Sequence, residues 1–451
     1  MGLQILFGWC YYPVMSTNKA VSSRAFLQST ASAVGTVTVA NAAPAILSQR
    51  SPNEVIGLAQ IGSGVRGYEL MGEAVRIPGN QYRVVCDLYD GFLERGAKRA
   101  GNEAVKRTKR FEDVISDKDV DAIIIAAPDH WHAPIALEAI AAGKHIYLEK
   151  PFTNTLDEAK AVVKAVREKG ITFQLGHNLR SSPAVWKARD LVSRGAIGDV
   201  VHVRAQHYRN SIEPYMRWYG FYNNFTMPED ADTQHIDWDR FQQNVEKHSF
   251  HPYRFFHWRC YWAYTNGVAG DLQSHALDQI NAVLGMGIPD TCAATGGLYY
   301  WRDGRETPDT WNAVFDYPDW GISINYAHVA MSDHFGSGVQ IMGKDGALEI
   351  GWSDAKLYAE QFSTKYREKV KELRDADPSW NYSQPIEVIE PEVPFEEASH
   401  VGDWLRAIKD GHRTRSNIDT AWEEIVTVLM AYESFKQGRK VRWDKARQEI
   451  V

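Results

Sequence analysis

A short glycine-rich stretch constrains the fold of this chain more than any other feature. Gly62-Ser63-Gly64-Val65-Arg66-Gly67 follows directly on the apolar run 55–61, and a helix-like segment continues to Arg76. An apolar run rich in β-branched residues is typical of a buried parallel strand. Glycines after such a strand allow a tight turn and let the backbone approach a pyrophosphate at the helix N-terminus. The sequence therefore predicts a dinucleotide site.

A second predicted strand identifies the preferred cofactor. Residues 82–86 are predicted to form a strand that ends at Asp87, which lies 20 residues beyond Gly67. A carboxylate in this position accepts hydrogen bonds from the adenosine ribose and repels a 2′-phosphate. We therefore expect NAD, with NADP less favoured. The alternative is that Asp87 is an ordinary turn or capping residue.

The same alternation of strand and helix continues through residue 175. It predicts a doubly wound parallel sheet, in which ligands bind beyond the carboxyl ends of the strands. Chemistry is then expected in three segments that follow strands, at 127–132, 149–151 and 176–180. The predicted elements are strands at 122–126, 145–149 and 171–175, and helices at 134–142 and 157–169.

Three further motifs follow the glycine turn in a fixed order. Pro128-Asp129-His130-Trp131-His132 follows the fourth strand, Glu149-Lys150-Pro151 follows the fifth, and Asp271-Leu272-Gln273-Ser274-His275-Ala276-Leu277-Asp278 comes later. Together with the glycine turn, this set resembles the Gfo/Idh/MocA oxidoreductases from about Val55 to the C-terminus. Many relatives carry threonine where this chain has Ala127, so one cofactor hydrogen bond is expected to be missing.

The resemblance implies a fold for the whole chain. It implies an α/β fold with an NAD-binding Rossmann domain at 53–178, then a domain at 179–451 built on a large open, mainly antiparallel sheet. That second domain would bind substrate and form a homo-oligomer, a dimer or tetramer, and a C-terminal helix would return toward the first domain. Strand-like runs at 200–207, 312–316 and 322–327 and helical patterns at 397–409 and 421–435 agree with this.

The resemblance also implies the site residues. Lys150 would reach the hydroxyl being oxidised, with His275 taking its proton and Asp271 orienting substrate or imidazole. Spacing i, i+4 puts Asp271 and His275 on one helix face, where Asp278 is either a supporting partner or a surface acid. Substrate binding would involve Lys150, Arg180, Asp271 and His275. Cofactor binding would involve Gly62, Ser63, Gly64, Val65, Arg66, Gly67, Asp87, Pro128, Asp129, His132, Glu149 and Asn178.

Other classes of site are not favoured. His130 and His132 could begin a zinc site, but no third ligand at fitting spacing is evident in the sequence, so no metal is expected. The four cysteines are widely separated, and the net charge of −7 offers no attraction to nucleic acid. Residues 302–309 indicate a hairpin loop without chemistry.

A dense set of aromatic side chains lies between Tyr208 and Tyr264. Aromatic faces suit the C–H faces of pyranose rings, which favours a sugar platform. The core of an inserted subdomain, or a subunit interface, explains the same composition equally well. The set includes Tyr215, Trp218, Tyr219, Tyr222, Trp238, Tyr253, Phe255, Phe256, Trp258, Tyr261 and Trp262.

The first fifty residues resemble a twin-arginine export signal. Ser22-Ser23-Arg24-Ala25-Phe26-Leu27 precedes a small-residue stretch and Ala40-Asn41-Ala42, but Ser23 replaces the first arginine of the motif. A disordered tail, with a cytoplasmic protein, is the alternative. The sequence has no run of about 18 apolar residues that would span a bilayer, so a soluble, exported, periplasmic protein is expected.

These observations predict an NAD-dependent oxidoreductase that acts on a hydroxyl of a sugar or polyol. Export would separate the protein from a free NAD pool, which favours a cycle that regenerates bound NAD. One alternative is an NAD-dependent glycoside hydrolase that uses transient oxidation and elimination. Another is a sugar-binding protein without catalytic activity, against which Lys150, Asp271 and His275 argue.

Overall fold

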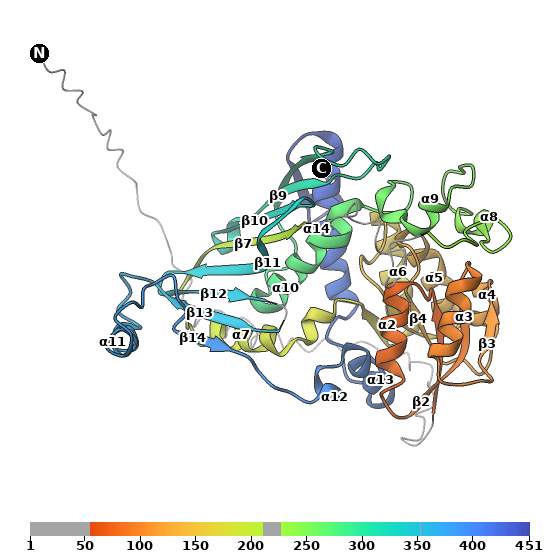
Figure 1. The fold of residues 1–451 in the computed structure, drawn as a ribbon, viewed down its shortest axis with the longest axis horizontal. Coiled ribbons are helices and arrows are strands. Elements are labelled where there is room, and N and C mark those ends of the chain that lie inside the picture. The colour runs from red at the N-terminus through yellow and green to blue at the C-terminus, as the bar shows by residue number, and fades with distance from the viewer. Residues whose placement is uncertain (1–54, 211–226, 352) are drawn as a thin grey trace, which may run out of the picture. The chain divides into compact units, whose positions relative to one another are not determined.

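Six parallel strands form the first sheet, in the order β3-β2-β1-β4-β5-β6 (Figure 1). This computed structural model describes residues 55–210, 227–351 and 353–451. The described residues, and every element below, belong to one compact unit. The strands are β1 (Ile56–Ile61), β2 (Asn80–Cys86), β3 (Lys106–Thr108), β4 (Ala122–Ile125), β5 (His145–Leu148) and β6 (Phe173–Leu175).

Helices alternate with these strands, as the sequence predicts for a doubly wound sheet. β1, β4 and β5 are mostly apolar and are buried at every position except His145, because helices cover both faces of a parallel sheet. β3 was not predicted, since its three residues are polar and largely exposed. The helices are α2 (Val65–Ala74), α3 (Asp90–Arg99), α4 (Phe111–Ser116), η1 (Asp129–Trp131), α5 (His132–Ala141) and α6 (Leu156–Lys169).

The second sheet has ten strands and is antiparallel except where β7 pairs with β10. The predicted fold class is therefore confirmed. Buried residues alternate with half-buried or exposed ones along β9 and β12, so one face packs against helices. The order is β14 (Glu387–Ile389), β13 (Ala355–Ala359), β12 (Gly346–Ile350), β11 (Ser332–Gly343), β7 (Val200–Arg209), β10 (Ile322–Val329), β9 (Thr310–Tyr317), β8 (Thr291–Gly297), β15 (Val441–Asp444) and β16 (Glu449–Ile450).

Three helices pack on the second sheet and connect it to the site. They are α7 (Pro183–Ser193), α10 (Ser274–Leu284) and α14 (Ile418–Gln437), and α14 also contacts α6 and β6 (Figure 1). The π-helical turn η5 (Ala269–Gln273) leads directly into α10. Such π turns inside helices are frequent at functional sites.

The predicted helix 397–409 is two helices in the structure. α12 (Phe395–Ala398) ends at Ser399, whose backbone is extended, and α13 (His400–Asp410) begins after it. The Ser399 hydroxyl caps α13 by accepting a hydrogen bond from the Gly402 N–H at 2.8 Å. α13 packs on α2 and β5 of the first sheet.

Two short helices, α8 (Trp238–Phe241) and α9 (Pro252–Phe256), and the turn η4 (Trp258–Cys260) lie in an insertion between β7 and η5. We call residues 229–262 the strap. Residues 1–54, with Ser23 and Arg24, and the aromatic residues Tyr215, Trp218, Tyr219 and Tyr222 lie outside the described residues. No helix within the described ranges is long and apolar enough to cross a membrane.

Candidate active site

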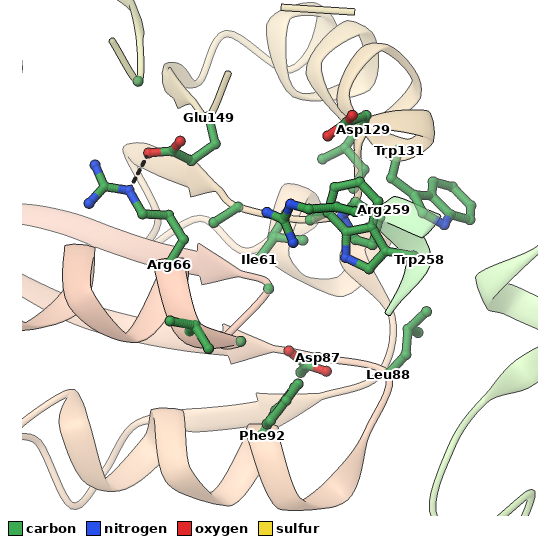
Figure 2. A pocket seen from close by; sticks show the side chains of 18 of the residues that line it. Ile61, Arg66, Asp87, Leu88, Phe92, Asp129, Trp131, Glu149, Trp258 and Arg259 are labelled. Carbon is green, nitrogen blue, oxygen red and sulfur yellow. Dashed lines mark hydrogen bonds and ion pairs between the residues drawn. The ribbon is translucent and has the colours of Figure 1, made fainter. Parts of the chain in front are cut away.

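A cavity of about 780 Å³ lies beyond the carboxyl ends of the first-sheet strands. One wall comes from the segments that follow β1, β2, β4, β5 and β6, and the opposite wall comes from the strap, η5 and α10. Figure 2 shows Asp87 at one end of the cavity, and Asp129, Arg259 and Trp258 close together at the other. The same cavity is lined by the predicted cofactor site and by Lys150, Asp271 and His275.

The glycine turn is sterically dictated. Gly62 has φ +84°, and a Cβ there would lie 2.5 Å from the Ala126 carbonyl oxygen, while a Cβ on Gly67 would collide with the Gly62 carbonyl. Gly64 is the N-cap residue of α2 and has no side chain with which to cap it. The first N–H groups of α2 are therefore available beside the cavity for an anion such as a pyrophosphate. These features fit the phosphates of NAD.

Asp87 follows β2 directly and lines the same cavity. Its carboxylate accepts hydrogen bonds from the Ser63 N–H at 2.7 Å and the Tyr89 N–H at 3.0 Å. Burial raises the pKa of Asp87 to about 6, although these N–H groups oppose the shift. Ser63 and Gly67 build the turn without lining the cavity wall.

The strap covers the Asp87 end of the cavity. It binds the loop after β2 through backbone hydrogen bonds from the Asp90 N–H to the His235 carbonyl at 3.1 Å and from the Asp237 N–H to the Leu88 carbonyl at 2.9 Å. The Tyr89 hydroxyl donates to Asp230 at 2.6 Å. These contacts fix the strap to the first domain independently of any ligand.

Aromatic residues of the strap pack mostly against one another and against Tyr89 and Phe92. Phe256 makes edge contacts with both rings, with centroids 5.1 Å from Tyr89 and 5.7 Å from Phe92. Within the described part, the aromatic set is therefore largely a buried core, as one of the two interpretations predicted. Its cavity-lining members are Phe241, Phe255, Phe256 and Trp258.

Lys150 lies two residues beyond β5 with its side chain 10% exposed. Its Nζ donates to the Asp271 carbonyl at 2.5 Å and to Oδ1 of the same residue at 3.1 Å. The loop that carries Lys150 is held from both sides, because His132 Nδ1 lies 2.7 Å from the Pro151 carbonyl and the Phe152 N–H donates to Glu424 at 3.3 Å. The lysine is thus fixed at the cavity wall.

Asp271 lies in the π turn η5 and accepts from two cations at one oxygen. Arg259 Nε donates to Oδ1 at 3.0 Å, the same atom that Lys150 contacts. Burial raises the pKa of this carboxyl, but Lys150 and Arg259 outweigh burial and bring the pKa to about 2. Asp271 is therefore ionised at any ordinary assay pH.

His275 lines the cavity one turn after Asp271. Burial, followed by the positive charge of Lys150, lowers the pKa of His275 well below its usual value. A neutral imidazole results, and only this form has a nitrogen that accepts a proton. Its ring meets His177 edge-on with centroids 5.6 Å apart.

The other predicted residues divide into those that line the cavity and those behind it. Asp129 lines it, accepts from the Thr265 hydroxyl at 2.8 Å, and has its pKa raised to about 7 by burial. Arg180 does not line it, because its Nε donates to Asp278 at 2.7 Å, and the buried His132 lies behind the wall. The remaining predicted lining residues are Gly62, Gly64, Val65, Arg66, Pro128, Glu149 and Asn178.

Arg66 and Glu149 form an ion pair of 2.8 Å along the cavity wall (Figure 2). His130 is bound through Nε2 to the Phe241 carbonyl at 2.8 Å, so it supports the strap. The sequence did not predict Arg259, since no motif contains it, and it indicated Trp258 only as one member of the aromatic set.

Two family models match the chain. One, described as an oxidoreductase family with an NAD-binding Rossmann fold, covers residues 56–177, and the other, the C-terminal alpha/beta domain of the same family, covers 233–442. Together they cover most of the chain.

Individual relatives are more distant. Levoglucosan dehydrogenase of Pseudarthrobacter phenanthrenivorans is 28% identical over 226 residues, 48% of each chain. 1,5-Anhydro-D-fructose reductase of Ensifer adhaerens is 33% identical over 148 residues, 33% of this chain and 44% of its own. The chain thus aligns with about half the length of these curated relatives.

A solved structure shows the same fold over a longer span. A levoglucosan dehydrogenase in complex with NADH and levoglucosan matches with a TM-score of 0.64 and 17% identity, over 86% of this chain and 99% of that one. The two family models, the sheet orders and this likeness agree. The chain belongs to the Gfo/Idh/MocA family of oxidoreductases, with an NAD-binding Rossmann domain followed by a C-terminal α/β domain.

Proposed function

We propose that this protein is an NAD(H)-dependent oxidoreductase that acts on a CH–OH group of a sugar, sugar derivative or polyol. The observation that carries the proposal is that Lys150, Asp271 and His275 line the same cavity as the glycine turn and Asp87. A dinucleotide and a hydroxyl-bearing substrate would therefore share one space.

The chain's own residues supply the proton chemistry. Bound NAD would supply the nicotinamide that accepts or returns a hydride. The neutral His275 can accept the hydroxyl proton, and Lys150 can hold the oxygen from which it leaves. Ionised Asp271 fixes Lys150 through the 3.1 Å contact, so the lysine does not have to be ordered again in each cycle.

The relatives support a carbohydrate substrate. Their names identify a dehydrogenase of levoglucosan and a reductase of 1,5-anhydro-D-fructose. We propose that Lys150, Asp271 and His275 bind the substrate and that Asn178 contacts the cofactor. Arg180 would contribute indirectly, through its hydrogen bond to Asp278. The largely exposed face of the second sheet, which includes Val314 and Asn325, is the proposed contact of a homo-oligomer.

We also propose that NAD stays bound through the catalytic cycle. The strap covers the Asp87 end of the cavity and is bound to the first domain by its own hydrogen bonds. We propose, from the resemblance of the N-terminus to a twin-arginine signal, that the protein is exported in the folded state. Such a protein would have to keep its NAD bound. A second sugar that bears a carbonyl group would then act as the hydride acceptor that regenerates the cofactor.

The experiment follows the absorbance of reduced nicotinamide in the purified protein while sugars, polyols and glycosides are added. A change of bound-cofactor absorbance without added NAD supports both the oxidoreductase activity and the proposal that NAD stays bound. Turnover that requires excess free NAD supports the dehydrogenase but contradicts retention. Release of a free sugar from a glycoside, without net NADH, would instead identify a glycoside hydrolase, and binding without any absorbance change would identify a sugar-binding protein.

A further inference from the structure

A buried histidine, His177, contacts His275 but does not line the cavity. It follows β6, and its ring meets the ring of His275 edge-on with centroids 5.6 Å apart. Its Nε2 lies 3.3 Å from Oε1 of Glu424 on α14, and its Nδ1 lies 3.9 Å from Oδ2 of Asp278 on α10. The side chains of His177, Asp278 and Glu424 are only 1%, 1% and 2% exposed. The imidazole therefore lies between two carboxyl groups that solvent does not reach.

The two carboxyl groups have different partners. Asp278 accepts a hydrogen bond from Arg180 Nε at 2.7 Å. Glu424 accepts from the Phe152 N–H at 3.3 Å, and His177 is the basic side chain within 4 Å of it in the part of the chain that the structure describes. A neighbouring carboxylate favours the protonated form of an imidazole, and their attraction is stronger in a buried place than in water. His177 and Glu424 together can therefore hold a proton.

Oxidation of a hydroxyl supplies such a proton. In the proposed reaction the C–H bond breaks with its electron pair, which passes to NAD as a hydride, and the O–H bond gives its proton to His275. Burial and Lys150 lower the pKa of His275 well below its usual value, so this imidazole does not keep the proton at neutral pH. Asp271 does not take it either, because Lys150 and Arg259 bring its pKa to about 2. The proton has to pass to another group.

A second buried histidine, His207 of β7, is a poorer acceptor than His177. It lines a small cavity together with His275, but Arg209 Nε donates to its Nε2 at 3.0 Å, and burial lowers its pKa to about 3. His177 has carboxyl groups as neighbours instead of a cation. The charged and titratable groups that face His177 or His275 are Arg66, Glu149, Lys150, Arg180, His207, Asp278 and Glu424.

We propose that His177 and Glu424 hold the substrate proton while the cofactor is reduced, and return it through His275 when the hydride leaves. This inference rests on the proposed function. One water molecule, or a small rotation of either ring, is enough to carry a proton across the edge contact. Because His177 and Glu424 act through His275, they are positioning residues.

Conservation of charge gives the physical reason for holding the proton. Hydride transfer to NAD removes the positive charge of the nicotinamide, and a proton kept on His177 replaces that charge inside the protein. Changing the net charge of a buried site is costly, so this exchange favours both halves of a closed cycle. The carbonyl of the second sugar then takes up the hydride and the same proton, which balances the reaction without exchange with solvent.

The first test needs no sugar. NAD-loaded protein in a weak buffer is mixed with excess NADH, and a pH indicator records the protons taken up for each NADH that replaces NAD. We expect about one proton per NADH, and a loss of about fivefold or more in Glu424→Gln and in His177→Asn. The glutamine keeps the size of Glu424 and an oxygen for the Phe152 N–H. The matched control is His207→Gln, which should keep the uptake of the unchanged protein.

The second test follows the proton in a single turnover. NAD-loaded protein is mixed with the best sugar from the panel, and nicotinamide absorbance and the pH indicator are recorded together. We expect hydride transfer with release of only a small fraction of a proton per NADH. In Glu424→Gln the release should rise to about one proton per NADH.

The outcomes separate this inference from the function on which it rests. Release of one proton per NADH by the unchanged protein, or no uptake when NADH binds, overturns the inference and leaves the oxidoreductase intact. Uptake that persists in Glu424→Gln and His177→Asn also overturns it, and its loss in Asp129→Asn instead would assign the proton to Asp129. If no sugar reacts, the proposed function fails and this inference fails with it.

Discussion

Lys150 and Asp271 form a largely buried ion pair, 3.1 Å from Nζ to Oδ1, although 120 residues separate them in the sequence. One comes from the loop after β5 and the other from the π turn before α10. The pair therefore joins the Rossmann domain to the second domain at the cavity. Its geometry underlies the predictions below.

Replacing Asp271 by Asn should leave Lys150 and Arg259 adjacent without a compensating charge. We expect kcat/KM to fall by about 10²- to 10⁴-fold, the usual range for a group that positions proton transfer. NADH binding, followed by its fluorescence, should change little, because Asp271 lies away from the glycine turn. Equal losses of NADH affinity and of kcat/KM would contradict this assignment.

Asp129 should make stability depend on pH. Burial raises its pKa from 3.8 to about 7 in the folded protein, so the folded state holds a proton that the unfolded state releases. Stability is then full below pH 4 and is lost as pH rises to about 7. Asp129→Asn should therefore stabilise the ligand-free protein at pH 8, by on the order of a few kcal/mol, and much less at pH 4. Urea unfolding at both pH values measures this, and an equal effect at both would contradict it.

The pH dependence of catalysis should distinguish Asp129 from His275. Because burial and Lys150 hold the pKa of His275 well below 6.5, no inflection of kcat/KM near pH 6.5 should belong to it. An inflection near pH 7 should persist in His275→Gln, at much lower activity, and should disappear in Asp129→Asn. Loss of the inflection in His275→Gln alone would reverse the assignment.

Loosening the strap should speed the release of cofactor. Tyr89→Phe removes the 2.6 Å hydrogen bond to Asp230, and Tyr89 does not line the cavity. Loss of one such bond is expected to raise the NADH dissociation rate about threefold to tenfold, measured by stopped-flow fluorescence. The control is Lys106→Gln, which removes an exposed ion pair with Asp117 elsewhere in the first domain. An unchanged rate in Tyr89→Phe would contradict a retaining strap.

The parts of this fold that could be predicted are those encoded locally. Strands β1, β4 and β5 of the first sheet are mostly apolar, β2 ends in the apolar residues Val84–Cys86, and Gly62, Asp87 and Lys150 follow such segments at short distances. Local order also marks the break at Ser399, because serine is a favoured N-cap residue. The apolar periodicity on both sides of Ser399 nevertheless favours one continuous helix, which is why the sequence predicts 397–409 as a single element.

The parts that could not be predicted depend on contacts between distant segments. The strap binds the first domain through backbone groups such as the His235 carbonyl, which no side-chain pattern reveals. Arg259 acquires its position only when η4 and η5 come together beside Lys150. Arg180 follows a strand as expected, but Asp278 takes its guanidinium away from the cavity.

The most direct test of the account is single-turnover hydride transfer in Lys150→Ala. The variant protein is loaded with NAD, mixed with the best substrate from the panel, and followed by nicotinamide absorbance, with bound NAD measured separately after denaturation. We predict an unchanged content of NAD and a transfer rate lower by about 10²- to 10⁴-fold. An unchanged rate of hydride transfer would contradict the central claim that Lys150 acts on the substrate hydroxyl.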